Sequence, residues 1–198
     1  NKIKKIIFSS TGSIYGESEK IPTSEKSSFP IQTSIYGASK LAGEGLISAY
    51  AEGYDIKCWI FRFVSILGPR YTHGHVYDFY KQLIINKNKK LKILGDGFQK
   101  KSYLNVFDCV SALILSTKKA KNKVNIFNLG CDESVQVKVS AKIIANKLNL
   151  KPKYVFSGGK RGWIGDQPFV YLKTSKIRRL GWKNKFNIKD SIKMTVEW

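Results

Sequence analysis

The order of apolar and polar positions along the chain predicts strands and helices in turn. Short, mostly apolar runs are typical of strands buried on both faces of a parallel sheet, and longer segments with apolar residues at helical spacing are typical of helices. The expected strands are residues 4–8, 56–64, 91–94, 102–106, 125–129 and 154–156. The expected helices are residues 36–54, 75–86, 107–118, 136–148, 174–182 and 188–198. This alternation indicates an α/β fold.

The same pattern predicts buried faces, caps and turns. We expect helix 36–54 to bury Leu41, Leu46, Ile47 and Tyr50, and helix 107–118 to bury Val110, Leu113 and Ile114. Ser134 and Asn187 are expected N-caps of the helices that follow them. Gly181 is expected to close helix 174–182, and Asp96-Gly97 to form a turn between strands 91–94 and 102–106.

Length and composition place the chain among globular proteins. With 198 residues, 42% of them hydrophobic, it can bury the core of one large domain or slightly more. No apolar run approaches the roughly 18 residues of a membrane span, and no charged-then-apolar leader opens the sequence. Cys58, Cys109 and Cys131 are odd in number and lack Cys-x-x-Cys spacing, which favours reduced thiols and a cytoplasmic location.

The formal net charge of +21 first suggests a polyanionic partner such as nucleic acid. However, only five of the 35 basic residues are Arg, and the lysines are spread through every segment without a recognisable docking module. We therefore expect no nucleic-acid function, although a positive field would suit a nucleotide-sugar pyrophosphate. His73 and His75 have no further ligands at metal-binding spacing, so we expect them in a solvated loop and expect no metal site.

Candidate chemistry is concentrated in Ser34-Ile35-Tyr36-Gly37-Ala38-Ser39-Lys40. In a helix, Tyr36 and Lys40 share one face with their Cβ atoms about 5–6 Å apart. An ammonium group beside a phenol favours the phenolate, so the two residues form a candidate acid–base pair. Upstream, strand 4–8 leads into Ser9-Ser10-Thr11, and Tyr15-Gly16 follows. Arg62, inside the buried strand 56–64, is expected to be structural and to need a nearby acceptor.

This combination resembles the active site of the extended short-chain dehydrogenase/reductases. It is most similar to the nucleotide-sugar epimerases, whose pattern is Ser-Ser-Ser/Thr-x-x-x-Tyr-Gly followed by Tyr-Gly-x-Ser-Lys. The resemblance covers nearly the whole chain and implies the C-terminal part of a Rossmann-type parallel sheet with a smaller α/β substrate-binding domain. By this resemblance, residues 1–70 are the remaining part of an NAD-binding Rossmann domain. Residues 71–198 are mainly the nucleotide-sugar domain, with some segments returning to the Rossmann sheet.

Later motifs extend the resemblance. Residues 95–108 match the spacing of the family's Gly-Asp-Gly-x-Gln-x-Arg-Asp-Phe-x-x-Val-x-Asp, with Lys101 in place of the arginine that grips the pyrophosphate. Lys101 keeps the charge but lacks the bidentate fork. Ser65 stands where the family has an Asn near the substrate. Residues 158–168 resemble a basic Gly-Asp-x-Pro loop in which Arg161 would meet the nucleotide diphosphate.

The resemblance therefore implies a set of site residues. The implied catalytic residues are Tyr36, Lys40 and Thr11. The implied contacts with NAD are Ser9, Ser10, Tyr36, Lys40 and Phe63. The implied contacts with the nucleotide sugar, expected to be a UDP-hexose, are Thr11, Ser65, Lys101 and Arg161.

No glycine-rich dinucleotide fingerprint occurs near residue 1. Compared with the resembled family, on the order of 100 residues of the Rossmann domain are missing, which indicates a truncated sequence or a fragment. We expect these 198 residues alone to bind NAD poorly and to be inactive. The intact protein is expected to be a homodimer formed through helix 36–54 and a helix of the missing half.

The residues after the strand hydroxyl distinguish the reactions of the resembled superfamily. Dehydratases resemble Thr-Asp-Glu there and decarboxylases keep a Glu, whereas this chain has Thr11-Gly12-Ser13. The pattern favours NAD-dependent 4-epimerisation of a nucleotide sugar through a transient 4-keto sugar over elimination. An NAD(P)-dependent nucleotide-sugar reductase, or a dehydratase, is the alternative enzyme. The non-enzyme alternatives are an inactive fragment and a regulatory or nucleic-acid-binding module.

Overall fold

Two compact units make up the chain. The computed structural model describes residues 3–29, 31–87, 89–162 and 169–198. Unit 1 comprises residues 1–64, 107–130 and 170–184, and unit 2 comprises residues 65–106, 131–169 and 185–198. The sequence indicated a division at residue 70. The chain leaves unit 1 after Val64 and returns to it in two later segments.

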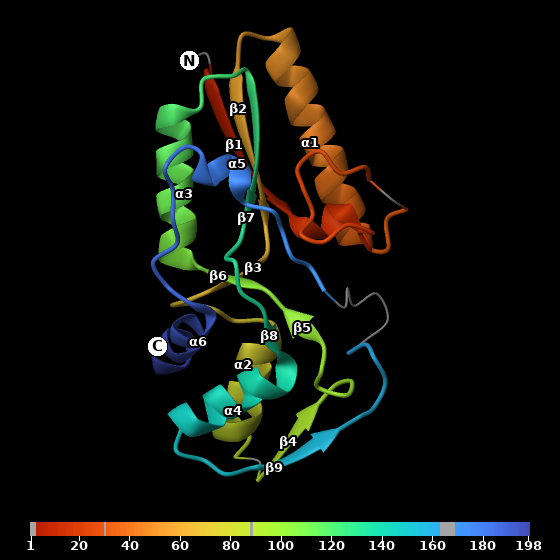
Figure 1. The fold of residues 1–198 in the computed structure, drawn as a ribbon, viewed down its shortest axis with the longest axis vertical. Helices are drawn as coiled ribbons and strands as arrows, with labels where there is room; N and C mark the ends of the chain where they lie inside the picture. The colour runs from red at the N-terminus through yellow and green to blue at the C-terminus, as the bar shows by residue number, and fades with distance from the viewer. Residues whose placement is uncertain (1–2, 30, 88, 163–168) are drawn as a thin grey trace. The chain divides into compact units, whose positions relative to one another are not determined.

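Unit 1 is built on a parallel sheet with strand order β1-β2-β7. Its two long helices, α1 and α3, lie on opposite sides of that sheet (Figure 1). In chain order its elements are β1 (Lys5–Thr11), η1 (Gly12–Tyr15), α1 (Ile35–Gly53), β2 (Lys57–Phe63), α3 (Val106–Lys119), β7 (Val124–Leu129) and α5 (Ser175–Arg178). The parallel α/β fold expected from the apolar pattern is confirmed, and the hydroxyl residues 9–11 belong to β1 itself.

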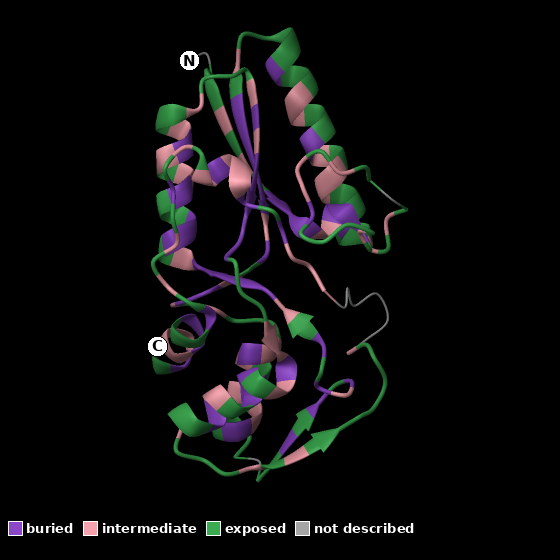
Figure 2. Cartoon of the chain, in the orientation of Figure 1, coloured by how far each residue is buried: buried purple, intermediate pink, exposed green. Residues whose placement is uncertain are grey.

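The central strand β2 is buried on both faces, as Figure 2 shows. Side chains alternate between the two faces of a strand. Cys58 and Ile60 pack with Ala51 of α1. Trp59 lies on the opposite face, where its indole N–H donates to the carbonyl of Ser116 in α3 over 3.2 Å. Two helices therefore cover the sheet, as the near-continuous apolar run of this strand indicated.

The buried face expected for α1 is partly wrong. Leu46 and Tyr50 are exposed at 65% and 57%, whereas Ala51 is fully buried. The physical reason is the close approach of helix and strand, since a Cβ atom on Gly43 would lie 2.8 Å from the ring of Phe8. Small helical residues therefore face the sheet, and the strands supply the large side chains.

α3 also buries small residues and exposes large ones. Val110 and Ile114, expected to be buried, are exposed at 48% and 51%. The buried positions of α3 include the small residues Cys109, Ala112 and Ser116. The spacing of apolar residues predicted the helix correctly, but the helix face that it predicted to be buried is partly exposed.

Unit 2 holds short paired strands and the helices α2, α4 and α6. In chain order its elements are β3 (Ser65–Leu67), α2 (His75–Tyr80), the π-helical turn η2 (Lys81–Ile85), β4 (Lys90–Ile93), β5 (Lys100–Lys101), β6 (Tyr103–Asn105), β8 (Val135–Gln136), α4 (Val137–Lys147), β9 (Lys153–Phe156) and α6 (Ile188–Glu197). β3 pairs with β6 and β4 with β9, both parallel, while β5 pairs antiparallel with β8. The strands on either side of the Asp96-Gly97 turn thus pair with other strands and not with each other.

Two expected helix caps have different outcomes. Asn187 caps α6, since its side-chain oxygen accepts the Asp190 N–H over 2.8 Å, and that prediction is confirmed. The prediction for Ser134 is wrong. α4 begins at Val137 after Gln136, which makes no side-chain cap hydrogen bond.

The cysteines and one histidine are packed inside the units. Cys58, Cys109 and Cys131 are free thiols, and burial raises the pKa of each. The expected solvated loop is wrong for His75, which begins α2 and lies against the Tyr103 ring at a centroid distance of 5.7 Å.

Across the described ranges, the helices are too short or too polar to cross a membrane. In the same residues, no three His, Cys, Asp or Glu side chains are grouped so that they could hold a metal ion.

Candidate active site

The carboxyl end of β1 carries the three expected hydroxyl residues. Ser9 is exposed, and its carbonyl accepts a hydrogen bond from Lys40 Nζ over 2.9 Å. Ser10 and Thr11 are buried, with 3% and 8% of their surface exposed. Thr11 Oγ1 accepts the Ser13 N–H over 3.1 Å and donates to Ser13 Oγ over 3.2 Å, so it caps η1. The Thr11 hydroxyl is therefore oriented by the turn that follows it.

The Tyr36 and Lys40 pair lies in the first two turns of α1. Ser34 begins the helix by accepting the Gly37 N–H over 3.0 Å. Lys40 Nζ lies 5.9 Å from the centroid of the Tyr36 ring. Tyr36 is 56% exposed, and among the described residues its hydroxyl has no hydrogen-bond partner. The expected stacking on one helix face is present, and the phenol is open to a ligand.

Gly37 brings this helix start against η1. A Cβ atom at Gly37 would lie 2.9 Å from Gln32 Oε1 and 3.0 Å from the carbonyl oxygen of Ser13. Gln32 in turn donates from Nε2 to the Ile14 carbonyl over 2.7 Å. Because η1 directly follows Thr11, these contacts place the first turn of α1 beside the hydroxyl end of β1 within unit 1.

Gly12, between Thr11 and Ser13, sits in a space too small for a side chain. A Cβ atom there would lie 2.8 Å from Val170 Cγ1 and 3.2 Å from the carbonyl oxygen of Phe63. Contacts below about 3.0 Å require something to move. Phe63, an expected cofactor contact, is partly buried at the end of β2, next to the Gly12 turn.

Three of the four expected substrate residues, Ser65, Lys101 and Arg161, belong to unit 2. Ser65 is exposed at the start of β3 and pairs in register with Tyr103 of β6. Lys101 is partly buried in β5 and pairs with Val135 of β8. Strand pairing thus fixes the backbone at both positions.

Arg161 is exposed on a loop that runs beside the Gly-Asp-Gly turn. Gly158 N donates to the Gly95 carbonyl over 3.1 Å. A Cβ atom on Gly95 would lie 3.2 Å from the Arg161 carbonyl oxygen. The two motifs are therefore neighbours in unit 2, although residues 163–168 of the expected basic loop lie outside the described residues.

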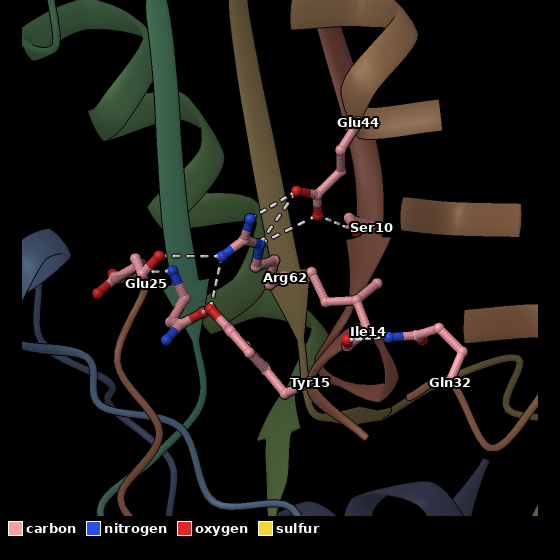
Figure 3. Close-up of polar contacts among 8 residues, drawn as sticks. Ser10, Ile14, Tyr15, Glu25, Gln32, Glu44 and Arg62 are labelled. Carbon is pink, nitrogen blue, oxygen red and sulfur yellow. Dashed lines mark hydrogen bonds and ion pairs between the residues drawn. The ribbon is translucent and has the colours of Figure 1, made fainter. Parts of the chain in front are cut away.

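Arg62 has the buried acceptor that the sequence led us to expect. Its Nη2 donates to Glu44 Oε2 over 2.6 Å, with 3% and 5% of the two side chains exposed (Figure 3). Burial opposes the charge, but hydrogen bonds and charge interactions with Glu44 and Tyr15 raise the pKa of Arg62 above its ordinary value. Arg62 is therefore a buried cation, and the expected nearby acceptor is confirmed.

Sequence reasoning missed Glu44 and Ser13. Glu44 lies one turn beyond Lys40, so the spacing Tyr36, Lys40, Glu44 already placed it on the same helix face. An acidic residue in an amphipathic helix is normally read as solvent-exposed, which concealed it. Ser13 follows Thr11 by two residues, and only the structure shows that the two hydroxyls share a hydrogen bond.

The family model described as "NAD dependent epimerase/dehydratase family" matches residues 1–130. A putative UDP-glucose 4-epimerase of Methanocaldococcus jannaschii is 30% identical, with 99% of this chain and 63% of that protein covered. The human dTDP-D-glucose 4,6-dehydratase is also 30% identical, with 100% of this chain and 57% of that protein covered.

Solved structures give the same picture. The crystal structure of a UDP-glucuronic acid 4-epimerase from Bacillus cereus, in complex with UDP-glucuronic acid and NAD, has a TM-score of 0.87 and 25% sequence identity. It is matched over 100% of this chain and 62% of that one. This chain thus spans about three fifths of the length of the proteins it resembles.

Proposed function

Because the chain belongs to the NAD-dependent epimerase/dehydratase family, we propose that it carries the acid–base and sugar-binding residues of a nucleotide-sugar 4-epimerase. The proposed substrate is a UDP-hexose, because the similar epimerases act on UDP-sugars, UDP-glucose in one case and UDP-glucuronic acid in another. The chain covers about three fifths of its relatives, so the proposed activity belongs to the full-length protein that carries it.

The observation that carries the choice of reaction is the turn Thr11-Gly12-Ser13. Dehydratases of the resembled superfamily place carboxylates after the strand hydroxyl, because eliminating water needs an additional acid and base. Gly12 carries no side chain, and a Cβ atom there would lie 2.8 Å from Val170 Cγ1, so a neighbour would have to move; Ser13 offers only a hydroxyl. The relatives include both epimerases and dehydratases, and the geometry at Gly12 supports epimerisation.

Tyr36 is the proposed acid–base group. Its exposed phenol would take the proton of the sugar C4 hydroxyl and later return a proton to the same oxygen. Lys40 is the neighbouring cation, with its Nζ 5.9 Å from the centroid of the Tyr36 ring. Thr11 would hydrogen-bond the C4 oxygen and stabilise charge that develops there. Its hydroxyl must then exchange its hydrogen bond to Ser13 for one to the sugar.

The donors near β1 fit the nicotinamide end of NAD. Lys40 uses one of its N–H groups on the Ser9 carbonyl, which leaves two for the hydroxyls of a ribose. When bound, NAD supplies a reversible hydride acceptor, so that the sugar carbon can be oxidised and reduced again without net change in the cofactor. The proposed contacts from this chain remain Ser9, Ser10, Tyr36, Lys40 and Phe63, although the Ser10 hydroxyl already donates to Glu44.

Lys101 and Arg161 are the proposed anchors of the pyrophosphate. Both are cationic, and the loop of Arg161 runs beside the turn that leads to Lys101. Lys101 would act as a point charge without the bidentate geometry of an arginine. Ser65 would donate one hydrogen bond to the nucleotide sugar, whereas the Asn of the resembled family has two N–H donors.

The test is turnover of UDP-glucose by the full-length protein with NAD, with UDP-galactose detected by NMR. We expect Tyr36→Phe to lower kcat by at least about 100-fold, because it removes the acid–base proton. Binding of UDP-glucose, measured by calorimetry, should stay within about twofold, since a single edge hydroxyl is lost. Tyr50→Phe, on an exposed tyrosine of the same helix, is the matched control and should keep full activity.

Retained turnover in Tyr36→Phe would refute the assignment of this residue. Net oxidation of reduced cofactor, followed by its absorbance, would identify a reductase instead. Formation of a stable 4-keto-6-deoxy sugar would identify a dehydratase and overturn the argument from Gly12.

A further inference from the structure

A row of polar residues crosses the carboxyl end of the unit 1 sheet on the side of α1. Ser10 of β1 is in register with Arg62 of β2, and Arg62 is in register with Asn128 of β7. The preceding rows on the same face are apolar and form a cluster with α1. The members of that cluster are Ile6, Phe8, Ile47, Ala51, Cys58, Ile60, Val124 and Ile126. The sheet therefore changes from an apolar to a polar surface at the level where β1 reaches its catalytic hydroxyls.

Glu44 joins this row to α1. Arg62 Nε donates to both Glu44 oxygens, over 3.0 and 3.2 Å, and Arg62 Nη2 donates to Oε2. Ser10 Oγ donates to Glu44 Oε1 in a short hydrogen bond. The carboxylate thus holds a residue of β1 and a residue of β2 at once, as Figure 3 shows.

The other side of the guanidinium holds the turn after β1. Arg62 Nη1 donates to the Tyr15 hydroxyl over 2.7 Å and to the Glu25 carbonyl over 3.3 Å. The Tyr15 hydroxyl donates to Asn128 Oδ1 over 2.9 Å. Tyr15 ends η1, the turn that begins immediately after Thr11. The pair therefore holds Ser10 through Glu44 and Tyr15 through Arg62, one on each side of Thr11.

Two consecutive turns of α1 are tied to two consecutive residues of β1. Lys40 Nζ donates to the Ser9 carbonyl over 2.9 Å, and Glu44 accepts from Ser10. Tyr36, Lys40 and Glu44 are spaced by four residues and therefore lie on one face of α1. A rotation of α1 would turn this whole face relative to β1.

We propose that the buried Glu44–Arg62 pair is a positioning device that sets the rotation of α1, so that Tyr36 and Lys40 stand beside the Thr11 end of β1. The proposal rests on the function proposed above. It makes Glu44 and Arg62 positioning residues, because their contacts are with protein groups of η1, β1 and α1 and not with reacting atoms.

Stability alone is a weak explanation for this pair. A buried ion pair loses its hydration, and replacing both partners by apolar residues of similar volume is often neutral or stabilising. An apolar replacement would, however, remove the directional hydrogen bonds to Ser10 and Tyr15. The double variant Glu44→Leu/Arg62→Met therefore separates a role in folding from a role in positioning.

The experiment measures three quantities in the full-length protein and in this double variant. They are the urea midpoint of unfolding, the amide hydrogen exchange of residues 10–14, and the kinetics of UDP-glucose turnover. We expect the midpoint to be nearly unchanged and exchange of residues 10–14 to accelerate by about tenfold or more, because local opening no longer breaks the network. We expect kcat to fall by about 100-fold with KM within about twofold, because misplaced catalytic groups affect mainly the reaction step.

The control is Glu52→Gln, which removes an exposed carboxylate of the same helix, 4.0 Å from Lys123 Nζ. It should change none of the three quantities. If the double variant folds and keeps parental exchange and kcat, the pair is only structural and the proposal is wrong.

If the double variant does not fold, Glu44→Gln gives the answer, since it keeps the volume and one oxygen acceptor. Faster exchange confined to residues 10–14 supports the proposal, and a uniform change along β1 refutes it. The exchange measurement needs no substrate, so it stands apart from the proposed reaction. Selective exchange together with full activity of Tyr36→Phe would overturn the reaction and leave the positioning intact.

Discussion

The two ends of the α1-facing surface of the unit 1 sheet are built on different principles. At the amino end, Cys58 and Ile60 are fully buried against Ala51, and contact is apolar and without direction. At the carboxyl end, Arg62 and Glu44 replace such contacts with hydrogen bonds of fixed geometry. The same helix and the same strands form both ends, so the difference lies in the residues alone.

The comparison shows how α1 can be attached to the sheet by one set of contacts and fixed in its rotation by another. Apolar burial favours contact at roughly 25 cal/mol per Å² and tolerates small shifts along the interface. Hydrogen bonds lose strength steeply when their angle is disturbed. The apolar end therefore accounts for attachment of α1 to the sheet, and the polar end for its rotation at the level of Tyr36 and Thr11.

The largest expected effect comes from breaking the polar end on one side only. Glu44→Ala leaves the Arg62 guanidinium buried without its carboxylate, and such a loss typically costs about 3–5 kcal/mol. This is a large share of the roughly 5–15 kcal/mol that stabilises a typical protein. Urea denaturation followed by circular dichroism measures it.

Glu52→Ala is the matched control on the same helix. Its side chain is 66% exposed, so we expect a change of less than about 0.5 kcal/mol. A loss below about 1 kcal/mol in Glu44→Ala would mean that water reaches the guanidinium, and the two ends of the surface would then be less different than described.

A partly buried polar contact in unit 2 provides a second comparison with the Arg62–Glu44 pair, because its contribution to stability is expected to depend on pH. Tyr103 Oη lies 2.8 Å from His75 Nδ1, and burial, with repulsion from Lys101, lowers the pKa of His75 from 6.5 to about 3. The folded state therefore binds fewer protons than the unfolded state between these values. The stability from neutral His75 is complete above pH 6.5 and is lost as the pH falls toward 3.

Between pH 6.5 and 5 we expect a loss of at most about 2 kcal/mol, measured as the unfolding free energy at each pH. Arg62 keeps its proton throughout this range, because its pKa is raised. His75→Gln should flatten the dependence, and His73→Gln, at an exposed position, should retain it. An unchanged slope in His75→Gln would show that other groups cause it.

Much of this fold could be predicted from the apolar pattern. Strand 56–64 and helix 36–54 were placed to within one or two residues, because a continuous apolar run and a helical period are local properties. The buried faces of α1 and α3 could not be predicted in the same way. The close approach at Gly43 depends on the ring of Phe8, far away in sequence, and a hydrophobicity pattern counts glycine as neutral.

The candidate site shows the same limit. Tyr36 and Lys40 were predicted from their spacing and residue types and Thr11 from the family resemblance, and their roles stay predictions. Glu44 was missed because an acid is buried only when its partner, here Arg62, meets it between α1 and the sheet. The sequence predicted that Arg62 needs an acceptor but could not choose among the acidic residues, because the choice depends on how α1 packs on the sheet.

The smallest expected effect tests whether the two ends are independent. Ile60 is fully buried in the apolar end, in register with Phe8 and Ile126. Ile60→Val removes one methylene group and should cost about 1 kcal/mol in urea denaturation. Because apolar contacts tolerate this loss without reorienting the helix, hydrogen exchange of residues 10–14 and kcat should not change.

Ile7→Val, at a residue of β1 that is 52% exposed, should cost less than about 0.5 kcal/mol and serves as the control. Faster exchange confined to residues 10–14 in Ile60→Val would show that the apolar rows also determine the rotation of α1. The conclusion that apolar contacts attach the helix and polar contacts fix its rotation would then be wrong.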